Sequence, residues 1–274
     1  MTMMTEQLIR LALAEDIGTG DITTDFLIPE HETGQGVLVA KERLLVAGTA
    51  TAAACFTELD PRCRVEVVAG DGSWVDKGDV ILKVEGTLRA LLKGERTALN
   101  FLQRLSGIAT HVSRYAEMVE GLPVRLVDTR KTTPGWRVLE KEAVRVGGAF
   151  NHRMALYDGV MIKDNHIAVS GGIRPAVEKV RRSISHLVKV EVEVSNFDEL
   201  QEALMAGADV IMLDNMAMED VKKAVALVDG RAMTEVSGNI TEENLRAYAE
   251  SGVDVVSSGA LTHQARSVDI SMRM

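Results

Sequence analysis

Cationic side chains are concentrated between Leu126 and Ile167, beside two short apolar runs that predict β-strands. Arg and Lys form strong, directional hydrogen bonds with carboxylates and phosphates. The net charge of the chain is −9, so a local basic cluster indicates a binding site rather than a basic coat. The sequence therefore favours a pocket for a small, highly anionic substrate. The cationic residues of this stretch include Arg130, Lys131, Arg137, His152, Arg153, Lys163 and His166.

Lys163 follows a run that is otherwise apolar, and a lysine at the end of a barrel strand has a second interpretation. It is the position of the imine-forming lysine of an aldolase. That chemistry needs a lysine with a lowered pKa, and a strongly anionic substrate in the pocket would oppose such a shift. Binding of an anionic substrate is therefore favoured over an aldolase.

Carboxylates are expected at the ends of two later strands. Glu191 and Glu193 alternate with valines, so both point to the same side of their strand. Glu193 lies nearer the strand end and is the better site candidate, while Glu191 is expected to lie deeper and to pair with a lysine. Glu193 and Asp214 together suit a hydrated Mg²⁺ ion beside substrate phosphates. The alternative is that these two carboxylates only neutralise Lys131 and Lys163.

The chain from about Leu91 alternates between helical and strand-like patterns. A long helix ends before Pro123, and the short apolar strands that follow predict parallel βαβ units. About six such units without a GxGxxG motif favour an α/β barrel over a dinucleotide-binding fold. The expected strands are Val124–Val127, Val160–Ile162, Val188–Val194, Val210–Leu213, Ala232–Val236 and Val253–Val256, and the expected helices include Ile173–Ser185, Asn196–Ala206, Met218–Val228 and Glu242–Ser251.

Polar residues follow every one of these strands, and the active site of a barrel lies at the carboxyl ends of its strands. Ser237-Gly238 and Ser258-Gly259 come after the last two strands, where backbone N–H groups often bind a phosphate. Asp214 and Ser237 have a structural alternative, since either could be the N-cap of the next helix.

The region from Thr23 to about Gly86 has a different, β-rich pattern with glycine-containing turns. Part of it resembles the β-sandwich of biotinyl and lipoyl carriers, but no lysine stands in the expected turn, so a purely structural β-domain is favoured. Cys55 and Cys63 have no neighbouring metal-ligand motif, and a zinc site is not expected.

The acidic net charge argues against a nucleic-acid partner. No apolar run reaches the ~18 residues of a membrane span, and the acidic N-terminal segment is not typical of a signal peptide. We therefore expect a cytoplasmic enzyme with no membrane partner.

Several motifs are similar to those of the quinolinate phosphoribosyltransferase family (nicotinate-nucleotide pyrophosphorylase, carboxylating). The most specific are DTRKTTPG at residues 128–135 and the NHR and KDNH segments that begin at Asn151 and Lys163. The resemblance covers nearly the whole chain, and only two small departures occur, at GGAF and at Ser258. A related molybdenum-transport-associated family shares DTRKTTPG but typically lacks KDNH.

The resemblance implies the roles of individual residues. Arg130, His152, Arg153 and Lys163 correspond to the quinolinate-binding set, and Lys131, Glu193 and Asp214 to the set for phosphoribosyl pyrophosphate and Mg²⁺. Ser237, Gly238 and Gly259, with Ser258 beside them, correspond to the 5′-phosphate set. Lys163, Glu193, Asp214 and Lys131 are the expected catalytic residues, with Glu193 and Asp214 as the metal-binding pair.

The resemblance also implies an architecture and a reaction. Residues 1–105 would form an open α/β sandwich domain, and residues 106–261 an incomplete parallel α/β barrel. A tail from about 262 to 274 would return to the first domain. The reaction would convert quinolinate and phosphoribosyl pyrophosphate to nicotinate mononucleotide, CO₂ and pyrophosphate in NAD biosynthesis. A homodimer or larger homo-oligomer is implied, in which Arg96 is lent to the neighbouring subunit. The alternative is a non-catalytic relative that only binds a dicarboxylate or a nucleotide.

Overall fold

The computed structural model describes residues 2–274, and the chain forms two compact units. The first unit comprises residues up to Ser113 together with Thr132–Gly148 and Gln264–Met274, and the second comprises Arg114–Lys131 and Ala149–His263. The expected domain boundary between residues 105 and 106 stays a prediction. The expected return of a tail, from about residue 262 to 274, to the first domain also stays a prediction.

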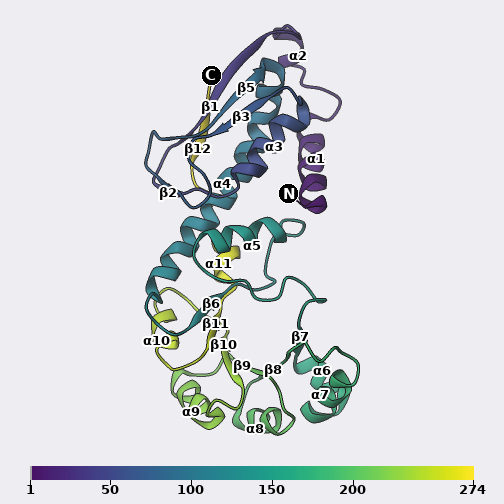
Figure 1. Cartoon of the computed structure of the whole chain (residues 1–274), viewed down its shortest axis with the longest axis vertical. Coiled ribbons are helices and arrows are strands. Elements are labelled where there is room, and N and C mark those ends of the chain that lie inside the picture. Colours follow the sequence, from purple (N-terminus) through teal and green to yellow (C-terminus); the bar gives the residue numbers. More distant parts are fainter. Residues whose placement is uncertain (1) are drawn as a thin grey trace. The chain divides into compact units, whose positions relative to one another are not determined.

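The first unit is built on an antiparallel sheet (Figure 1). Its strand order is β12-β1-β5-β3, and a small β2-β4 pair accompanies it. The long helix α4 (Leu88–Met118) begins in this unit. The other elements are α1 (Met3–Ile17), α2 (Thr24–Leu27), β1 (Thr33–Ala40), β2 (Leu44–Leu45), α3 (Thr49–Leu59), β3 (Arg64–Val67), β4 (Trp74–Val75), β5 (Val80–Thr87), α5 (Arg137–Val146) and β12 (Ile270–Arg273).

The β-rich pattern of residues 23–86 correctly indicated the strands, but it missed the short helix α2 and the longer helix α3 (Thr49–Leu59). This segment is rich in Ala and Thr and begins after Gly48, whose φ of 91° belongs to the left-handed region. Its apolar face buries Ala52, Cys55 and Phe56, so packing supplies the stability that a helix of this length lacks by itself.

Gly107 on α4 marks a close approach between this helix and the C-terminal segment. A Cβ atom at this position would lie 2.1 Å from the carbonyl oxygen of Arg266. The same segment then continues into β12, which pairs antiparallel with β1. A glycine is therefore required for the C-terminal segment to pack against the helix.

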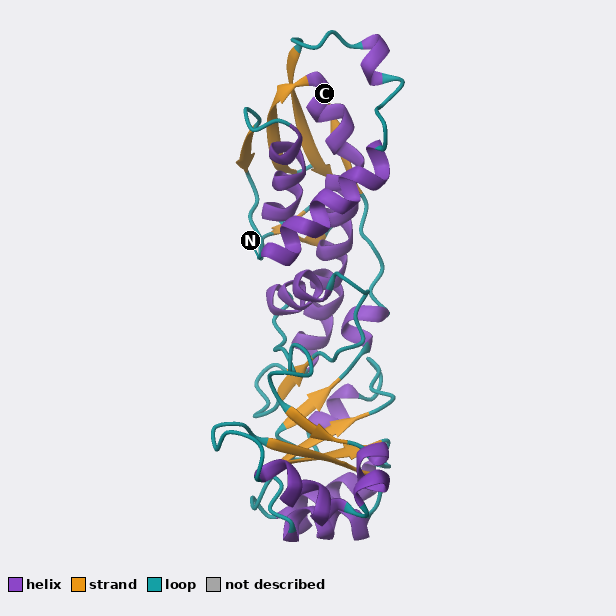
Figure 2. Ribbon diagram, turned by 90° about the vertical axis from the view of Figure 1, so that its right-hand side faces the viewer, coloured by secondary structure: helices purple, strands orange, loops and turns teal. Residues whose placement is uncertain are grey.

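The second unit is a parallel sheet of six strands in the order β6-β11-β10-β9-β8-β7. The strands β6 and β7 are consecutive in the chain but form opposite edges, so the ring of strands is not closed and the barrel is incomplete. Figures 1 and 2 show helices along the outer face of these strands. The elements are β6 (Arg125–Val127), β7 (Val160–Ile162), α6 (Asp164–Ser170), α7 (Ile173–Arg181), β8 (Val190–Val194), α8 (Phe197–Met205), β9 (Val210–Asp214), α9 (Met218–Val228), β10 (Met233–Ser237), α10 (Leu245–Ala249), β11 (Val255–Ser257) and α11 (Ala260–His263).

All six strands expected from the apolar runs of this unit are confirmed, with ends that differ by two residues at most. The expected helices are confirmed too, although α7 and α10 are shorter than the sequence pattern suggested. The alternative that Asp214 and Ser237 are helix N-caps is wrong, because the N-cap residues of α9 and α10 are Ala217 and Asn244.

The parallel register places polar side chains on the inner face of the sheet. Val190, Val192 and Val194 are buried on the outer face of β8, so Glu191 and Glu193 between them face inward. Glu193 is in register with Met212, which makes Met212 and Asp214 inward-facing on β9. The same register continues through the other strands, and the polar residues of neighbouring strands meet inside the ring.

Among residues 2–274, no helix has the length and hydropathy needed to cross a membrane.

The close packing at Gly107 can be tested by the substitution Gly107→Ala. Alanine normally stabilises a helix relative to glycine, but here the added methyl group would collide with the Arg266 carbonyl group. We expect the free energy of unfolding of the first unit to fall by about 2 kcal/mol, as measured by chemical denaturation. Asn100→Ala, at an exposed position of the same helix, is the control and should change stability by less than about 0.5 kcal/mol. A Gly107→Ala protein at least as stable as wild type would contradict this packing.

Candidate active site

A cavity of about 400 Å³ opens at the carboxyl ends of the parallel strands. All of its lining residues belong to the second unit. This is the end of the sheet at which barrel enzymes carry their active sites. The lining residues are Thr129, Arg130, Lys131, His152, Arg153, Met161, Lys163, Glu193, Met212, Asp214, Asn215, Ser237 and Ser257.

Strand register explains why residues from distant parts of the chain share this cavity. Met161 is in register with Glu191, Glu193 with Met212, and Ser237 with Asp214. Ser257 is in turn opposite Ser237. Inward-facing polar positions of successive strands therefore lie next to one another at the same end of the ring.

Opposite charges face one another across the cavity. The ammonium group of Lys163 donates to the Glu193 carboxylate, and the two form an ion pair. This ion pair engages the ammonium group with a carboxylate, whereas an aldolase lysine must be free to attack a carbonyl group. The structure thus supports an electrostatic role for Lys163 over the aldolase alternative.

Arg153 is held by its own segment. Its Nη1 atom donates to the carbonyl oxygen of Gly159 at 2.8 Å. Burial and the nearby positive charge of Arg130 both lower the pKa of Arg153. Two guanidinium groups that repel each other in this way favour an anion between them, because a carboxylate or phosphate relieves the repulsion.

Lys131 is positioned by the helix α11. The hydroxyl group of the fully buried Thr262 donates to the backbone oxygen of Lys131 at 2.7 Å. A Cβ atom at Gly259 would lie 2.7 Å from Cδ of Lys131, so the glycine leaves space for the lysine side chain. Gly259 therefore contributes to the site by shaping it, whether or not its N–H group binds a phosphate.

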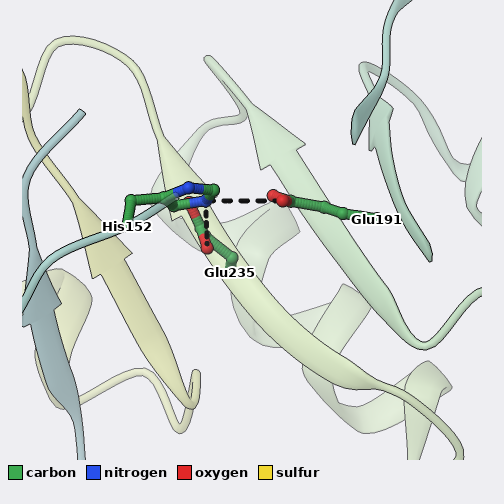
Figure 3. A group of neighbouring side chains, drawn as sticks. All are labelled: His152, Glu191 and Glu235. Carbon is green, nitrogen blue, oxygen red and sulfur yellow. Dashed lines mark ion pairs between the residues drawn. The ribbon is translucent and has the colours of Figure 1, made fainter. Parts of the chain in front are cut away.

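His152 is fixed from two sides. The carboxylate of the fully buried Asp128 accepts hydrogen bonds from the backbone N–H of His152 at 2.8 Å and from the side chain of Asn151 at 2.7 Å. On the other side, Nε2 of His152 lies 3.4 Å from Glu191 and 3.5 Å from Glu235, two carboxylates from different strands (Figure 3). The expectation that Glu191 pairs with a lysine was wrong, because its partner is His152.

The histidine and the two buried carboxylates form a proton-holding cluster. Burial by itself lowers the pKa of His152, but the hydrogen bonds and charges of Glu191 and Glu235 outweigh it and raise that pKa from 6.5 to about 10. Burial also raises the pKa of Glu191, against the effect of His152, and the charge of Glu235 adds to the rise. One oxygen of each carboxylate is buried without a hydrogen-bond partner in the described chain. Such perturbed buried groups are typical of functional sites.

The backbone N–H of Arg153 donates to Nδ1 of His152 at 2.8 Å, and this contact decides where the protons lie. An imidazolium would carry a proton on Nδ1 and lose the contact. A neutral ring with its proton on Nε2, beside one protonated carboxyl group, keeps it. Both forms hold the same number of protons, so the raised pKa belongs to the cluster as a whole rather than to the ring alone.

These three side chains are also the one group of three potential metal ligands found within residues 2–274. A metal ion at Nε2 would need an unprotonated Nε2 and therefore a proton on Nδ1. Because Nδ1 accepts from the Arg153 N–H, the geometry favours a proton over a metal ion at this position.

The cavity gathers most of the residues singled out in the sequence. Arg130, Lys131, His152, Arg153, Lys163, Glu193, Asp214 and Ser237 all line it. Gly238, Ser258 and Gly259 lie near it without being among the lining residues, and the hydroxyl group of Ser258 is directed to the carbonyl oxygen of Ile240. Arg96 is an exposed residue of α4 in the first unit. The individual substrate-binding roles stay predictions.

Sequence reasoning missed Glu235 and gave no individual role to Asn215 and Ser257, which follow or end strands of the sheet. A signal for Glu235 was present, because it stands two residues before Ser237 on an apolar strand, as Glu191 stands before Glu193. Ser257 is the inward-facing member of its serine pair, which only the register of β11 with β10 reveals. Asn215 stands directly after Asp214 in the sequence, and only the structure shows that its side chain lines the cavity.

The fold and the site together define an α/β-barrel enzyme for anionic substrates. Two family models cover the chain almost completely. The C-terminal domain of quinolinate phosphoribosyl transferase matches residues 108–273, and the N-terminal domain of the same family matches residues 21–106. The chain belongs to the quinolinate phosphoribosyltransferase family.

Individual relatives agree with this membership. A probable nicotinate-nucleotide pyrophosphorylase (carboxylating) of Bacillus subtilis is 45% identical over 97% of this chain and 92% of its own length. The protein of the same name from Synechocystis is 46% identical, over 96% and 90%. The solved structure of the nicotinate-nucleotide pyrophosphorylase from Francisella tularensis is 40% identical and has a TM-score of 0.93, covering 98% of this chain and 95% of that one.

The proton-holding cluster predicts that the His152 ring does not titrate near neutral pH. Ring ¹⁵N shifts should stay constant between about pH 6 and pH 8.5, where an unperturbed histidine changes charge. The raised pKa also makes a contribution to stability that is fully present below pH 6.5 and is lost as the pH rises through about 10. Glu235→Gln, which removes one carboxylate, should move the titration toward neutral pH. A wild-type ring that titrates near pH 6.5 would show that the carboxylates do not act on it.

Proposed function

We propose that the cavity of the second unit binds quinolinate and phosphoribosyl pyrophosphate and that the chain works as a decarboxylating quinolinate phosphoribosyltransferase. The products are nicotinate mononucleotide, CO₂ and pyrophosphate. The curated relatives carry the name of this activity, which belongs to NAD biosynthesis.

The observation that carries the proposal is the arrangement of charge around the cavity. Four cationic side chains and two carboxylates line one space of about 400 Å³. Dicarboxylate and phosphate groups require the cations, while a ribosyl carbon that becomes positively charged during transfer requires the carboxylates. The four cations are Arg130, Lys131, Arg153 and Lys163, and the carboxylates are Glu193 and Asp214.

Phosphoribosyl transfer then depends on positioning and electrostatics. Arg130 and Arg153 grip the carboxylates of quinolinate and orient its ring nitrogen. Lys131 binds the departing pyrophosphate. As the bond from the ribose to pyrophosphate breaks, the carboxylates of Glu193 and Asp214 stabilise the oxocarbenium-like transition state, and the ring nitrogen forms the new bond.

Loss of CO₂ follows from the product of this first step. The new bond makes the ring nitrogen cationic, and the bond between the adjacent ring carbon and its carboxylate breaks with its electron pair left on the carbon. The neighbouring positive charge stabilises this pair until a proton is added. His152 contributes by its fixed place on the floor of the cavity, since both of its ring nitrogens have partners within the protein.

A Mg²⁺ ion is part of the proposal. The oxygen donors of Glu193 and Asp214 have the chemistry that Mg²⁺ prefers, and both line the cavity. Glu193 is already paired with Lys163. The carboxylate of Asp214 is therefore more available than that of Glu193 to the ion and its waters. When bound, the ion would neutralise the pyrophosphate charge.

The direct test is incubation of the purified protein with quinolinate, phosphoribosyl pyrophosphate and Mg²⁺. Quinolinate should disappear, and nicotinate mononucleotide and CO₂ should form in equal amounts. Chelation of Mg²⁺ should lower the rate, and added Mg²⁺ should restore it. Binding of quinolinate without turnover under any of these conditions would favour the non-catalytic alternative.

The proposal further includes a cytoplasmic homodimer or larger homo-oligomer in which Arg96 serves the active site of the partner subunit. Subunit complementation tests this arrangement. Arg96→Ala and Lys163→Ala should each be inactive alone. A mixture should regain about a quarter of wild-type activity, because about half of the dimers are hybrids and each hybrid has one intact site of two. No recovery after verified subunit exchange would place Arg96 outside the neighbouring site.

A further inference from the structure

Asp214 is the first member of a chain of side-chain hydrogen bonds at the ends of β9 and β10. Nδ2 of Asn215 donates to Oδ2 of Asp214 at 2.9 Å. Nδ2 of Asn239 in turn donates to Oδ1 of Asn215 at 3.0 Å. Asn215 itself lines the cavity, whereas Asn239 is not among the lining residues. Two amides therefore connect the loop after β10 with a carboxylate of the active site.

The backbone of both loops is shaped around the Asn215 amide. Asn215 and Asn239 have φ angles of 53° and 50°, in the left-handed region that few residues other than glycine adopt. Gly238, between β10 and Asn239, has a φ of 97°. A Cβ atom at Gly238 would lie 2.2 Å from Oδ1 of Asn215, so only glycine leaves space for this amide. Backbone strain of this kind is concentrated at functional sites.

Further hydrogen bonds hold the two asparagines in place. The backbone N–H of Asn215 donates to the carbonyl oxygen of Ser237 at 2.9 Å. Nδ2 of Asn244 donates to the carbonyl oxygen of Asn239 at 2.8 Å, and Oδ1 of Asn244 accepts from the Thr241 N–H at 2.8 Å. The relay thus rests on the segment that begins α10.

The direction of the relay follows from the two ends of each amide. An amide donates through nitrogen and accepts through oxygen. The Asn239 donor binds the oxygen of Asn215 and so turns the nitrogen of Asn215 toward Asp214. The reverse orientation of Asn215 would place two oxygens against each other. A carboxylate has a broad torsional preference of its own, so a hydrogen bond to one oxygen is what fixes its plane.

We propose that Asn239 and Asn215 are positioning residues that orient the Asp214 carboxylate, with Oδ2 held by the relay and Oδ1 presented to the ribosyl-phosphate substrate and its cation. This inference rests on the proposed function of the site. It also gives Gly238 a second reason to be glycine, separate from any contact of its N–H group with a phosphate.

The substitution Asn239→Asp tests the relay at the position farthest from the substrate. Aspartate has the same size as asparagine and also tolerates the left-handed region. The substitution replaces the Nδ2 donor of Asn239 with a carboxylate oxygen, which accepts. The nitrogen of Asn215 should then turn toward the introduced carboxylate, and its oxygen toward Asp214. Asn239→Gly keeps the backbone conformation and removes the amide without reversing the relay. Asn196→Asp is the matched control, since Asn196 follows β8 at the same end of the sheet and a carboxylate can still accept the N-cap hydrogen bond from the Glu199 backbone N–H.

Steady-state kinetics should separate the two substrates. Asn239→Asp should raise KM for phosphoribosyl pyrophosphate about tenfold or lower kcat by a similar factor, the usual effect of losing a partner of a ligand-binding carboxylate. KM for quinolinate should change less than twofold. Asn239→Gly should show a smaller effect in the same direction, and Asn196→Asp should behave as wild type. Calorimetric titration with phosphoribosyl pyrophosphate and Mg²⁺ should give the same order of affinities, and thermal melting verifies that each variant is folded.

The outcomes distinguish the relay from the function on which it rests. A wild-type protein without turnover would overturn the proposed function and the relay with it. An active wild type, with a folded Asn239→Asp variant that matches Asn196→Asp in both substrates, would overturn the relay alone. An equal loss of affinity for quinolinate and phosphoribosyl pyrophosphate would also overturn it, because a general distortion of the cavity would then be the cause.

Discussion

The register between neighbouring parallel strands is the constraint on which the site depends. Side chains at every second position of a strand face the same side, and register decides which of them meet their neighbours. Glu193, Asp214 and Ser237 share a cavity because β8, β9 and β10 pair as they do. A shift of one residue in any strand would turn its polar positions outward and bury its valines inside the ring.

Placing so many charges in and beneath one cavity is costly, most of all for the buried Glu191 and Glu235, and the structure offsets this cost by pairing them. Lys163 is paired with Glu193, and the buried Glu191 and Glu235 share the Nε2 side of His152. A carboxylate that lost its partner in such a place would be strongly destabilising. The pairs therefore keep the cavity charged and ordered before a substrate arrives, which lowers the reorganisation needed for transfer.

Much of this architecture was predictable from local patterns. Apolar runs of the right length indicated the six parallel strands, and alternation in β8 correctly placed Glu191 and Glu193 on one face. The helix α3 was missed, because an Ala- and Thr-rich segment has weak periodicity and is stabilised by tertiary packing. His152, the partner of Glu191, was also missed. It lies 39 positions before Glu191 in the chain, and nothing in the sequence near Glu191 identifies it.

The sequence by itself determined the kinds of chemical groups, the strand and helix periods, and the motifs that resemble one enzyme family. Only the tertiary structure decided that His152 lies between Glu191 and Glu235, and that Asn239 reaches Asp214 through Asn215. The physical reason is that hydrogen bonds between such distant residues require positions within a fraction of an ångström. Strand register, left-handed loop residues and the space left by glycine set those positions, and each of them depends on the folded ring of strands as a whole.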